Sequence, residues 1–189
     1  MIEFAIDGSG TFIDLCLFEG GKPIFLMYSK PGKTHSQLLV DTVDFMLKTT
    51  DKTLEEIDCL YCVAGPGRHT SIRVVISTLK GLFFSRKDIK CYRVNTLDLV
   101  AATVKTVGVF RVVGEFFSSE SYFSDYSIED NGEIRRLCGP NKAKEEGIFN
   151  TELKIFKTTD SRLHPRTVHI HRIKKYAEEL ELFSLNPIY

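Results

Sequence analysis

The chain has 189 residues, 43% of them hydrophobic, which is enough to bury a core and fits one large domain or two small ones. Its 25 basic and 25 acidic side chains balance, so no overall electrostatic field attracts nucleic acid, anionic lipid or an acidic substrate. No apolar stretch is long enough to span a membrane, no signal peptide is apparent, and four of the five cysteines lie in strand-like apolar runs. We therefore expect a cytoplasmic protein with reduced thiols and no membrane contact.

The first half of the sequence predicts three strands followed by alternating helices and strands. Apolar runs at 2–7, 11–19 and 22–29 are separated by glycine-rich turns, which is typical of an antiparallel meander. A capping-box spacing at Thr34–Gln37 then opens a helix that we expect to reach about Thr49. Further along we expect a strand at 59–64, a helix from about Ser71 to Arg86, a strand at 90–95 and a helix opening at Thr96. This order predicts a mixed sheet with crossover helices.

The pattern changes after Thr106 to short strand-like pieces, with a hairpin signal at Asn131-Gly132. Residues 172–183 carry apolar side chains at helical spacing, so we expect a helix near the end of the chain. His169 and His171 share one face of a candidate strand, and a half-exposed strand is favoured over a metal site because no third ligand is evident. We therefore expect an N-terminal lobe of residues 1–106 and a smaller C-terminal lobe of residues 107–189.

The two predicted helices of the first lobe carry small or apolar residues on the side away from the sheet. These positions are Leu38, Thr42 and Phe45 in the first helix and Val74, Ser77, Thr78, Gly81 and Ser85 in the second. Small residues four positions apart allow another helix to approach closely, and apolar residues on a second face are uncommon without a partner. We predict an interface with another polypeptide. The alternative is that the two helices pack side by side and bury each other's second faces.

Two glycine-rich turns are candidates for binding phosphate. The turn at 64–71 leads into a helix N-terminus, where free N–H groups, Arg68 and Arg73 suit an anion and Thr70 is a candidate cap. The turn at 7–11 joins two strands, and Asp7 is a candidate ligand for a metal ion or water. Neither turn matches a Walker loop, and a tight turn alone explains the glycines. The candidate phosphate-loop residues are Asp7, Gly8, Ser9, Gly10, Gly65, Gly67 and Thr70.

Four segments, AIDGSGTFIDLCLFEGGKPI, HSQLLVDTVDFML, GPGRHTSIRVVISTLKGL and VNTLDLVAA, together closely resemble the TsaB family, also called YeaZ. The similarity runs in register over residues 2–104, and the terminal LNPIY resembles the closing segment of the family. The resemblance implies an α/β, actin/sugar-kinase-like (ribonuclease H-like) two-lobed fold with mixed sheets. The second lobe looks shorter than is usual in the family. Arg68, His69, Ser71 and Val75 depart from the family pattern around the Gly-Pro-Gly turn.

The same resemblance implies a noncatalytic accessory subunit of the tRNA threonylcarbamoyladenosine modification complex, which acts on ANN-decoding tRNAs. The implied partner is the catalytic homologue TsaD, or a second copy in a homodimer, with the first two helices as the interface. A TsaE-like ATPase and tRNA are reached through the complex. The TsaD family holds a metal with two histidines one helical turn apart, but here His35 is followed by Leu39, so we expect no metal site. We expect no cofactor, with weak or shared binding of ATP or ADP left open.

Two other functions remain open from the sequence. A nucleotide-dependent phosphotransferase or ATPase of the actin-like superfamily would use Asp7 and the two glycine turns. A direct RNA-binding module would use residues 135–175, which hold 11 Lys/Arg and 4 Asp/Glu, although a solvated surface is the simpler interpretation. The scattered serines show no Ser/His/Asp arrangement, so the sequence gives no support to a protease.

Overall fold

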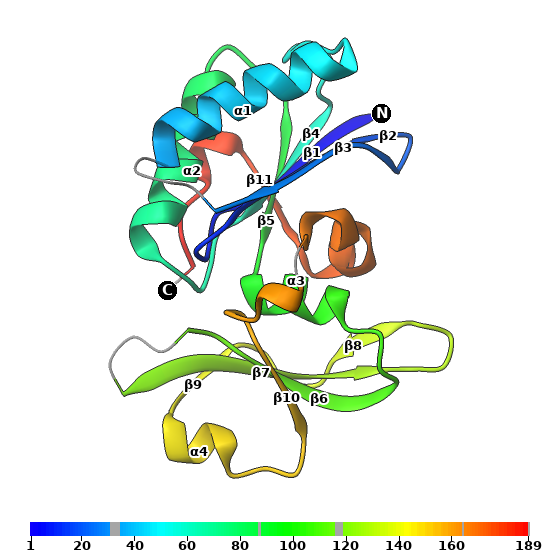
Figure 1. Cartoon of the computed structure of the whole chain (residues 1–189), viewed down its shortest axis with the longest axis vertical. Helices are drawn as coiled ribbons and strands as arrows, with labels where there is room; N and C mark the ends of the chain where they lie inside the picture. The colour runs from blue at the N-terminus through cyan, green and yellow to red at the C-terminus, as the bar shows by residue number, and fades with distance from the viewer. Residues whose placement is uncertain (31–34, 87, 116–118, 164, 189) are drawn as a thin grey trace.

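The computed structural model describes residues 1–30, 35–86, 88–115, 119–163 and 165–188, and two mixed β-sheets organise them into two lobes (Figure 1). The strands are β1 (Ile2–Asp7), β2 (Ile13–Glu19), β3 (Lys22–Ser29), β4 (Cys59–Val63), β5 (Lys90–Val94), β6 (Gly108–Val113), β7 (Glu120–Ile128), β8 (Ile134–Arg136), β9 (Asn141–Lys144), β10 (Lys154–Lys157) and β11 (Glu178–Leu180). The α-helices are α1 (His35–Thr50), α2 (His69–Leu82), α3 (Thr96–Thr103) and α4 (Glu145–Phe149). The 3-10 helices are η1 (Ser161–Leu163), η2 (Thr167–Tyr176) and η3 (Leu182–Ser184).

The first sheet has the strand order β11-β5-β4-β1-β2-β3. β1, β2 and β3 form the predicted antiparallel meander, while β4 lies parallel to β1 and β5 lies parallel to β4. Every residue of β1 and β4 is buried, because both faces of the sheet are covered and the strands are apolar throughout. The expected mixed sheet with crossover helices is therefore confirmed. The capping box that starts at Thr34 begins outside the described residues.

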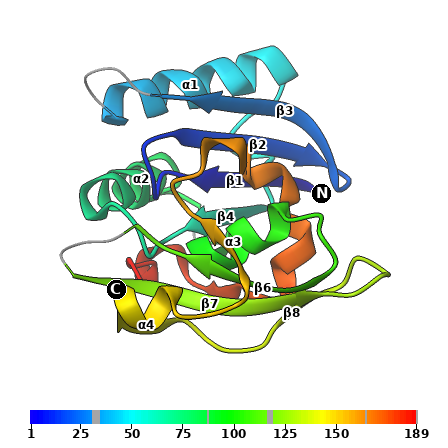
Figure 2. The ribbon, with the colours of Figure 1, turned by 60° about the horizontal axis from the view of Figure 1, so that its bottom comes forward.

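Two hydrophobic cores lie on opposite faces of the first sheet. One joins the sheet to α1 and α2 and includes Leu39 and Ile72. The other joins the sheet to α3, η2 and the second sheet and includes Tyr61, Phe110 and Ile170. In Figure 2, α3 and η2 lie between the two sheets. The second sheet has the order β10-β6-β7-β8, and β9 also pairs with β7. The two lobes therefore share one continuous apolar core.

The end of the chain returns to the first lobe. Residues 172–183 do not form the predicted helix: η2 ends at Tyr176, and β11 then pairs antiparallel with β5. After β11, Leu182 and Leu185 enter the core beneath α2, and the Ile188 N–H donates to the Ala64 carbonyl at 2.6 Å. The helical spacing was misleading because a three-residue strand is stabilised by pairing with the edge of β5, which no local pattern reveals. Residues 178–188 thus pack with the first sheet, although the two-lobe division assigned them to the second lobe.

Four of the five cysteines lie in strands, as the sequence predicted. Cys16, Cys59, Cys62 and Cys91 are buried in strands of the first sheet, and Cys138 is partly exposed in the second lobe. Among the residues that the structure describes, none of the helices has both the length and the apolar character needed to cross a bilayer.

Candidate functional site

The predicted interface positions on α1 differ in their surroundings. Leu38 is half-buried against the first core, and the buried Thr42 hydroxyl donates to the Leu38 carbonyl at 2.6 Å. Phe45 is 61% exposed, and its ring packs edge-on against Phe25 of β3 with 6.0 Å between centroids. Val40 is 43% exposed. The structure therefore brings Phe45 and Val40 of this helix to the surface and buries much of Leu38 and Thr42 within the lobe.

The predicted positions on α2 form a more open surface. Ser77 and Gly81 are exposed on the helix, Ser85 is exposed just after its end, and Val74 and Thr78 are half-buried. A Cβ atom on Gly81 would meet no other atom within 4 Å, so this position is open in the folded chain. The opposite side of α2 buries an apolar stripe against the first sheet. α1 and α2 contact each other, so the side-by-side packing of the two helices is also present (Figure 1).

Two exposed aromatic side chains at the C-terminal end of α2 were missed by sequence reasoning. Phe84 is 72% exposed, Phe183 is 48% exposed, and their rings meet edge-to-face at 5.8 Å. The Lys80 ammonium donates to the Phe183 carbonyl at 2.9 Å, which fixes this part of the chain end beside the helix. Because the two rings come from segments about a hundred residues apart, no local signal could have joined them. Phe84 and Phe183 therefore add exposed aromatic surface just beyond the end of the helix that carries Gly81.

The turn after β1 is held by its own polar groups. The buried Asp7 carboxylate accepts hydrogen bonds from the Ser9 backbone N–H at 2.8 Å and the Ser9 hydroxyl at 2.6 Å. A Cβ on Gly8 would lie 2.5 Å from Val75 Cγ2 of α2, whereas a Cβ on Gly10 would meet nothing within 4 Å. Gly8 is therefore required because the turn packs closely on α2.

The Gly-Pro-Gly turn packs directly on the turn that follows β1. The Arg68 N–H donates to the Ser9 carbonyl at 2.7 Å, and a Cβ on Gly67 would lie 2.2 Å from the same oxygen. Gly65 has φ +112°, a left-handed conformation that favours glycine. The expectation that Thr70 caps the helix is wrong, because α2 begins at His69 with Arg68 at the N-cap, and Thr70 is exposed in the first turn. Backbone packing explains Gly65 and Gly67.

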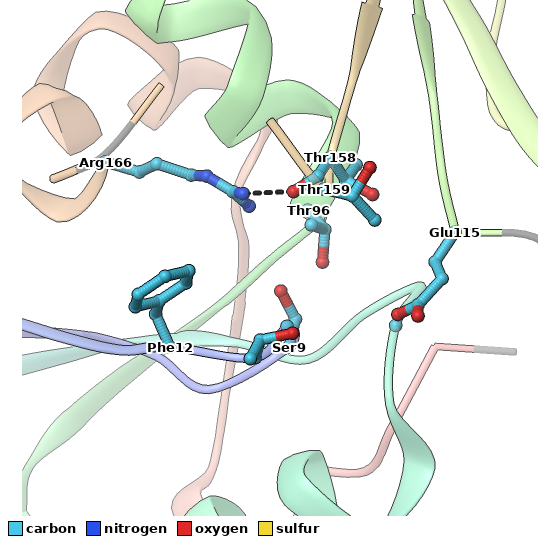
Figure 3. A pocket seen from close by; sticks show the side chains of 10 residues that line it. Ser9, Phe12, Thr96, Glu115, Thr158, Thr159 and Arg166 are labelled. Carbon is cyan, nitrogen blue, oxygen red and sulfur yellow. Dashed lines mark hydrogen bonds between the residues drawn. The ribbon is translucent and has the colours of Figure 1, made fainter. Parts of the chain in front are cut away.

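A buried arginine lies beside the turn that follows β1. Arg166 is 1% exposed, its Nη1 lies 3.5 Å from Asp7 Oδ2, and its Nη2 donates to the Thr158 carbonyl. The Arg166 backbone N–H donates to the carboxylate of Asp14, which is also buried. Burial lowers the pKa of Arg166, and Asp7 and Asp14 oppose that shift by stabilising its positive charge. Figure 3 shows this guanidinium group pointing at Thr158, with Ser9 and Thr96 nearby.

Very little space remains beside Arg166. The cavity has a volume of about 20 Å³, and Ser9, Thr96, Glu115 and Thr158 are among the residues that line it. An ion pair between Arg68 and Glu115, with 3.3 Å between nitrogen and oxygen, bridges the two lobes next to the cavity. A second cavity of about 230 Å³ adjoins it, since Gly67 and Glu115 line both.

Two further buried carboxylates connect elements across the molecule. Glu3 accepts from the Tyr61 hydroxyl at 3.2 Å and contacts His171 Nε2 at 3.0 Å and Lys174 Nζ at 3.5 Å. Asp98 of α3 accepts from the Tyr126 hydroxyl at 2.8 Å and pairs with Arg136 at 2.7 Å. Burial raises the pKa of Asp98, and Arg136 opposes the shift. The Glu3 carboxylate thus links β1 to η2, and the Asp98 carboxylate links α3 to β7 and β8.

The strand predicted for His169 and His171 is wrong, because both residues lie on η2. This segment folds back between α3 and the first sheet, where Ile170 and Ile173 are buried in the second core. Within the described ranges, no group of three or more His, Cys, Asp or Glu side chains is arranged to hold a metal ion.

The basic segment 135–175 is largely neutralised within the fold. Seven of its basic side chains pair with carboxylates: Arg135, Arg136, Lys142, Arg162, Arg166, Lys174 and Lys175. Arg172 donates to the carbonyls of Ala102 and Val104. These contacts favour the interpretation of this segment as a solvated surface over a free RNA-binding face.

The two mixed sheets, with α1 and α2 on the outer face of the first and α3 between the lobes, define a two-lobed α/β fold. Over its whole length the chain is similar to YeaZ from Pseudomonas aeruginosa, with a TM-score of 0.79 and 20% identity, covering 100% of this chain and 99% of that one. It is also similar to an uncharacterized protein with similarity to peptidase YeaZ from Pseudomonas aeruginosa, with a TM-score of 0.81, 18% identity and coverage of 100% and 98%.

The family of TsaD, tRNA N6-adenosine threonylcarbamoyltransferase, matches residues 29–110 of the chain. The resemblance to YeaZ is therefore confirmed at the level of the fold. Because the two alignments extend over nearly the full length of both solved structures, they give no support to the expected shortening of the second lobe.

Proposed function

We propose that this chain is the noncatalytic accessory subunit of a tRNA threonylcarbamoyladenosine modification complex for ANN-decoding tRNAs. In this proposal it pairs with a TsaD-like catalytic homologue, or with a second copy of itself, and reaches tRNA and a TsaE-like ATPase through the complex. The observation that carries the proposal is the combination of a YeaZ fold over the whole chain with a TsaD-family match over residues 29–110. That matched segment contains both α1 and α2.

The outer face of α2 provides the proposed docking surface. Ser77 and Gly81 allow a partner helix to approach the backbone closely, and Phe84 and Phe183 add exposed aromatic area at the end of the helix. Neighbouring exposed aromatic side chains are typical of binding sites. On α1, Val40 and Phe45 are the apolar side chains that remain open to a partner.

Two observations support the noncatalytic part of the proposal. Both concern positions that the catalytic family would need in order to bind a metal ion or a nucleotide. Leu39, at the position of the second metal-binding histidine, is fully buried in the first core. The Asp7 carboxylate is committed to Ser9 and Arg166. We propose that any ATP or ADP is bound weakly or shared with the partner.

Co-purification with the TsaD-like homologue of the same organism tests the docking surface. We expect Gly81→Leu to weaken the complex by about tenfold or more, because the new side chain projects into the space that the partner occupies. The folded chain has room for this side chain, and glycine is a poor helix former, so Gly81→Leu should leave the monomer at least as stable. Gly139→Leu is the matched control, since a Cβ at Gly139 also meets nothing within 4 Å and the position lies in the second lobe.

The outcomes separate the surface from the function. A complex that survives Gly81→Leu unchanged would place the interface elsewhere and leave the accessory role intact. A wild-type chain that binds no TsaD-like homologue and adds nothing to threonylcarbamoyladenosine formation would contradict the function itself. The alternative, a phosphotransferase or ATPase, predicts turnover of Mg·ATP by this chain alone.

A further inference from the structure

Arg166 connects the first-lobe turn to the second lobe. The residue precedes η2 and reaches back to the end of β1, where its guanidinium lies beside the Asp7 carboxylate. The same guanidinium donates to the carbonyl of Thr158, whose own N–H donates to the Val113 carbonyl at the end of β6. One side chain therefore bridges a carboxylate of the first sheet and the backbone of the second sheet.

The charged groups around Asp7 are all buried. Asp7 and Asp14 are 2% and 0% exposed, and Arg166 is buried beside both. Thr167 also donates to Asp14, through its hydroxyl and its backbone N–H. A buried carboxylate is very costly unless a cation or several donors neutralise it. At Asp7 the nearby cation is the guanidinium of the chain itself.

The nucleotide that an actin-like fold implies does not fit this site. The cavity of about 20 Å³ beside Arg166 holds roughly one water molecule, which needs about 10–15 Å³ by the same measure. A phosphoryl group, with four oxygens around phosphorus, is far larger. The Thr96 hydroxyl, which lines the cavity, has no hydrogen-bond partner among the described residues, so a single water would satisfy it. The space is matched to water and to Arg166.

We propose that Arg166 is a built-in cation between the lobes. Its guanidinium group neutralises Asp7, fills the space where a ligand would bind, and excludes a metal–nucleotide ligand from the turn that follows β1. This inference does not depend on the proposed partner, because it concerns contacts within one chain. The proposal gives Asp7 a structural role: its carboxylate, which is suited to bind a metal ion, binds the Arg166 guanidinium group instead.

Chemical rescue of Arg166→Gly tests the proposal. Removing a buried ion-pair partner should lower the melting temperature by roughly 6–20 °C for a chain of this size. Guanidinium at low millimolar concentration should then bind in the vacated space and raise the melting temperature of Arg166→Gly by several degrees. The same additive should leave the wild type unchanged, because its site is already filled.

Arg136→Gly is the matched control, since Arg136 also pairs with a buried carboxylate, Asp98, but lies outside the cavity at the first turn. Stabilisation of Arg166→Gly alone supports the proposal. Equal stabilisation of both variants, or a folded Arg166→Gly that does not respond, would overturn it. Stabilisation of the wild type by Mg·ATP that Asp7→Asn abolishes would also overturn it, because the nucleotide phosphates and Arg166 cannot share the space beside Asp7.

If Arg166→Gly does not fold, a double-mutant cycle gives a second test. Arg166→Met and Asp7→Asn should each lower the urea midpoint, and the double variant should lower it by clearly less than the sum of the two single effects. Strict additivity would show that Arg166 does not neutralise Asp7.

Discussion

Gly67 and Gly10 belong to the two turns that meet at the end of the first sheet, but their surroundings differ. A Cβ on Gly67 would lie 2.2 Å from the Ser9 carbonyl oxygen and 2.9 Å from Ser9 Cβ, and the backbone there cannot move aside. A Cβ on Gly10 would meet nothing within 4 Å. We therefore expect Gly67→Ala to lower the free energy of unfolding by about 1–3 kcal/mol and Gly10→Ala to change it by less than about 0.5 kcal/mol. Urea denaturation measures both, and equal effects would show that the turns are not packed as described.

Burial also determines the chemistry of the thiols. It raises the pKa of Cys16, Cys59 and Cys91 from 9.0 to about 12, because a thiolate is poorly stabilised away from water. In the native protein at pH 8, we expect a thiol reagent to label the partly exposed Cys138 and to label the others only after unfolding. Labelling of Cys16 or Cys91 at the rate of Cys138 would contradict this burial.

The same shifts predict a loss of stability in alkali. The folded chain retains these protons above pH 9, where the unfolded chain releases them, so the stabilisation is complete below pH 9 and disappears as the pH rises toward about 12. The urea midpoint should therefore fall from pH 8 to pH 10.5. A midpoint that stays constant over this range would contradict the prediction.

At the scale of elements, the parts that the sequence predicted well are those with local signals. β1 to β4, α1 and α2 follow from apolar runs, helical spacing and glycine turns that lie within each segment. β11 could not be predicted, because its three residues form a strand only by pairing with β5, more than eighty residues earlier. Leu38 is half-buried for a similar reason, since the first core covers part of a side chain that the isolated helix leaves open.

The candidate site shows the same limit. The glycine turns and the small residues of α2 are visible in the sequence, because each lies in one segment. The pairs Arg166–Asp7 and Phe84–Phe183 join residues that are distant in the chain, so only the folded structure reveals them.

At the scale of the whole molecule, the two lobes are connected by buried charge as well as by apolar contacts. Asp7 and Asp98 each pair with an arginine from residues after 130, and Glu3 contacts His171 and Lys174 of η2. The second core also contains residues of both sheets, α3 and η2. A fragment that contains only the first lobe therefore leaves buried carboxylates without their cations and an apolar sheet face without its cover.

We accordingly expect the fragment of residues 1–106 to remain unfolded on its own, although its strands and helices carry clear local signals. It lacks β11 along β5, Leu182 and Leu185 in the first core, and η2 over the opposite face of the sheet. Far-UV circular dichroism and amide proton dispersion measure this directly. Mixing or co-expressing the fragment with residues 107–189 should restore the native spectrum, because every missing contact is then supplied in trans. A fragment 1–106 that folds cooperatively alone would show that the chain end is dispensable and that the first lobe is an independent domain.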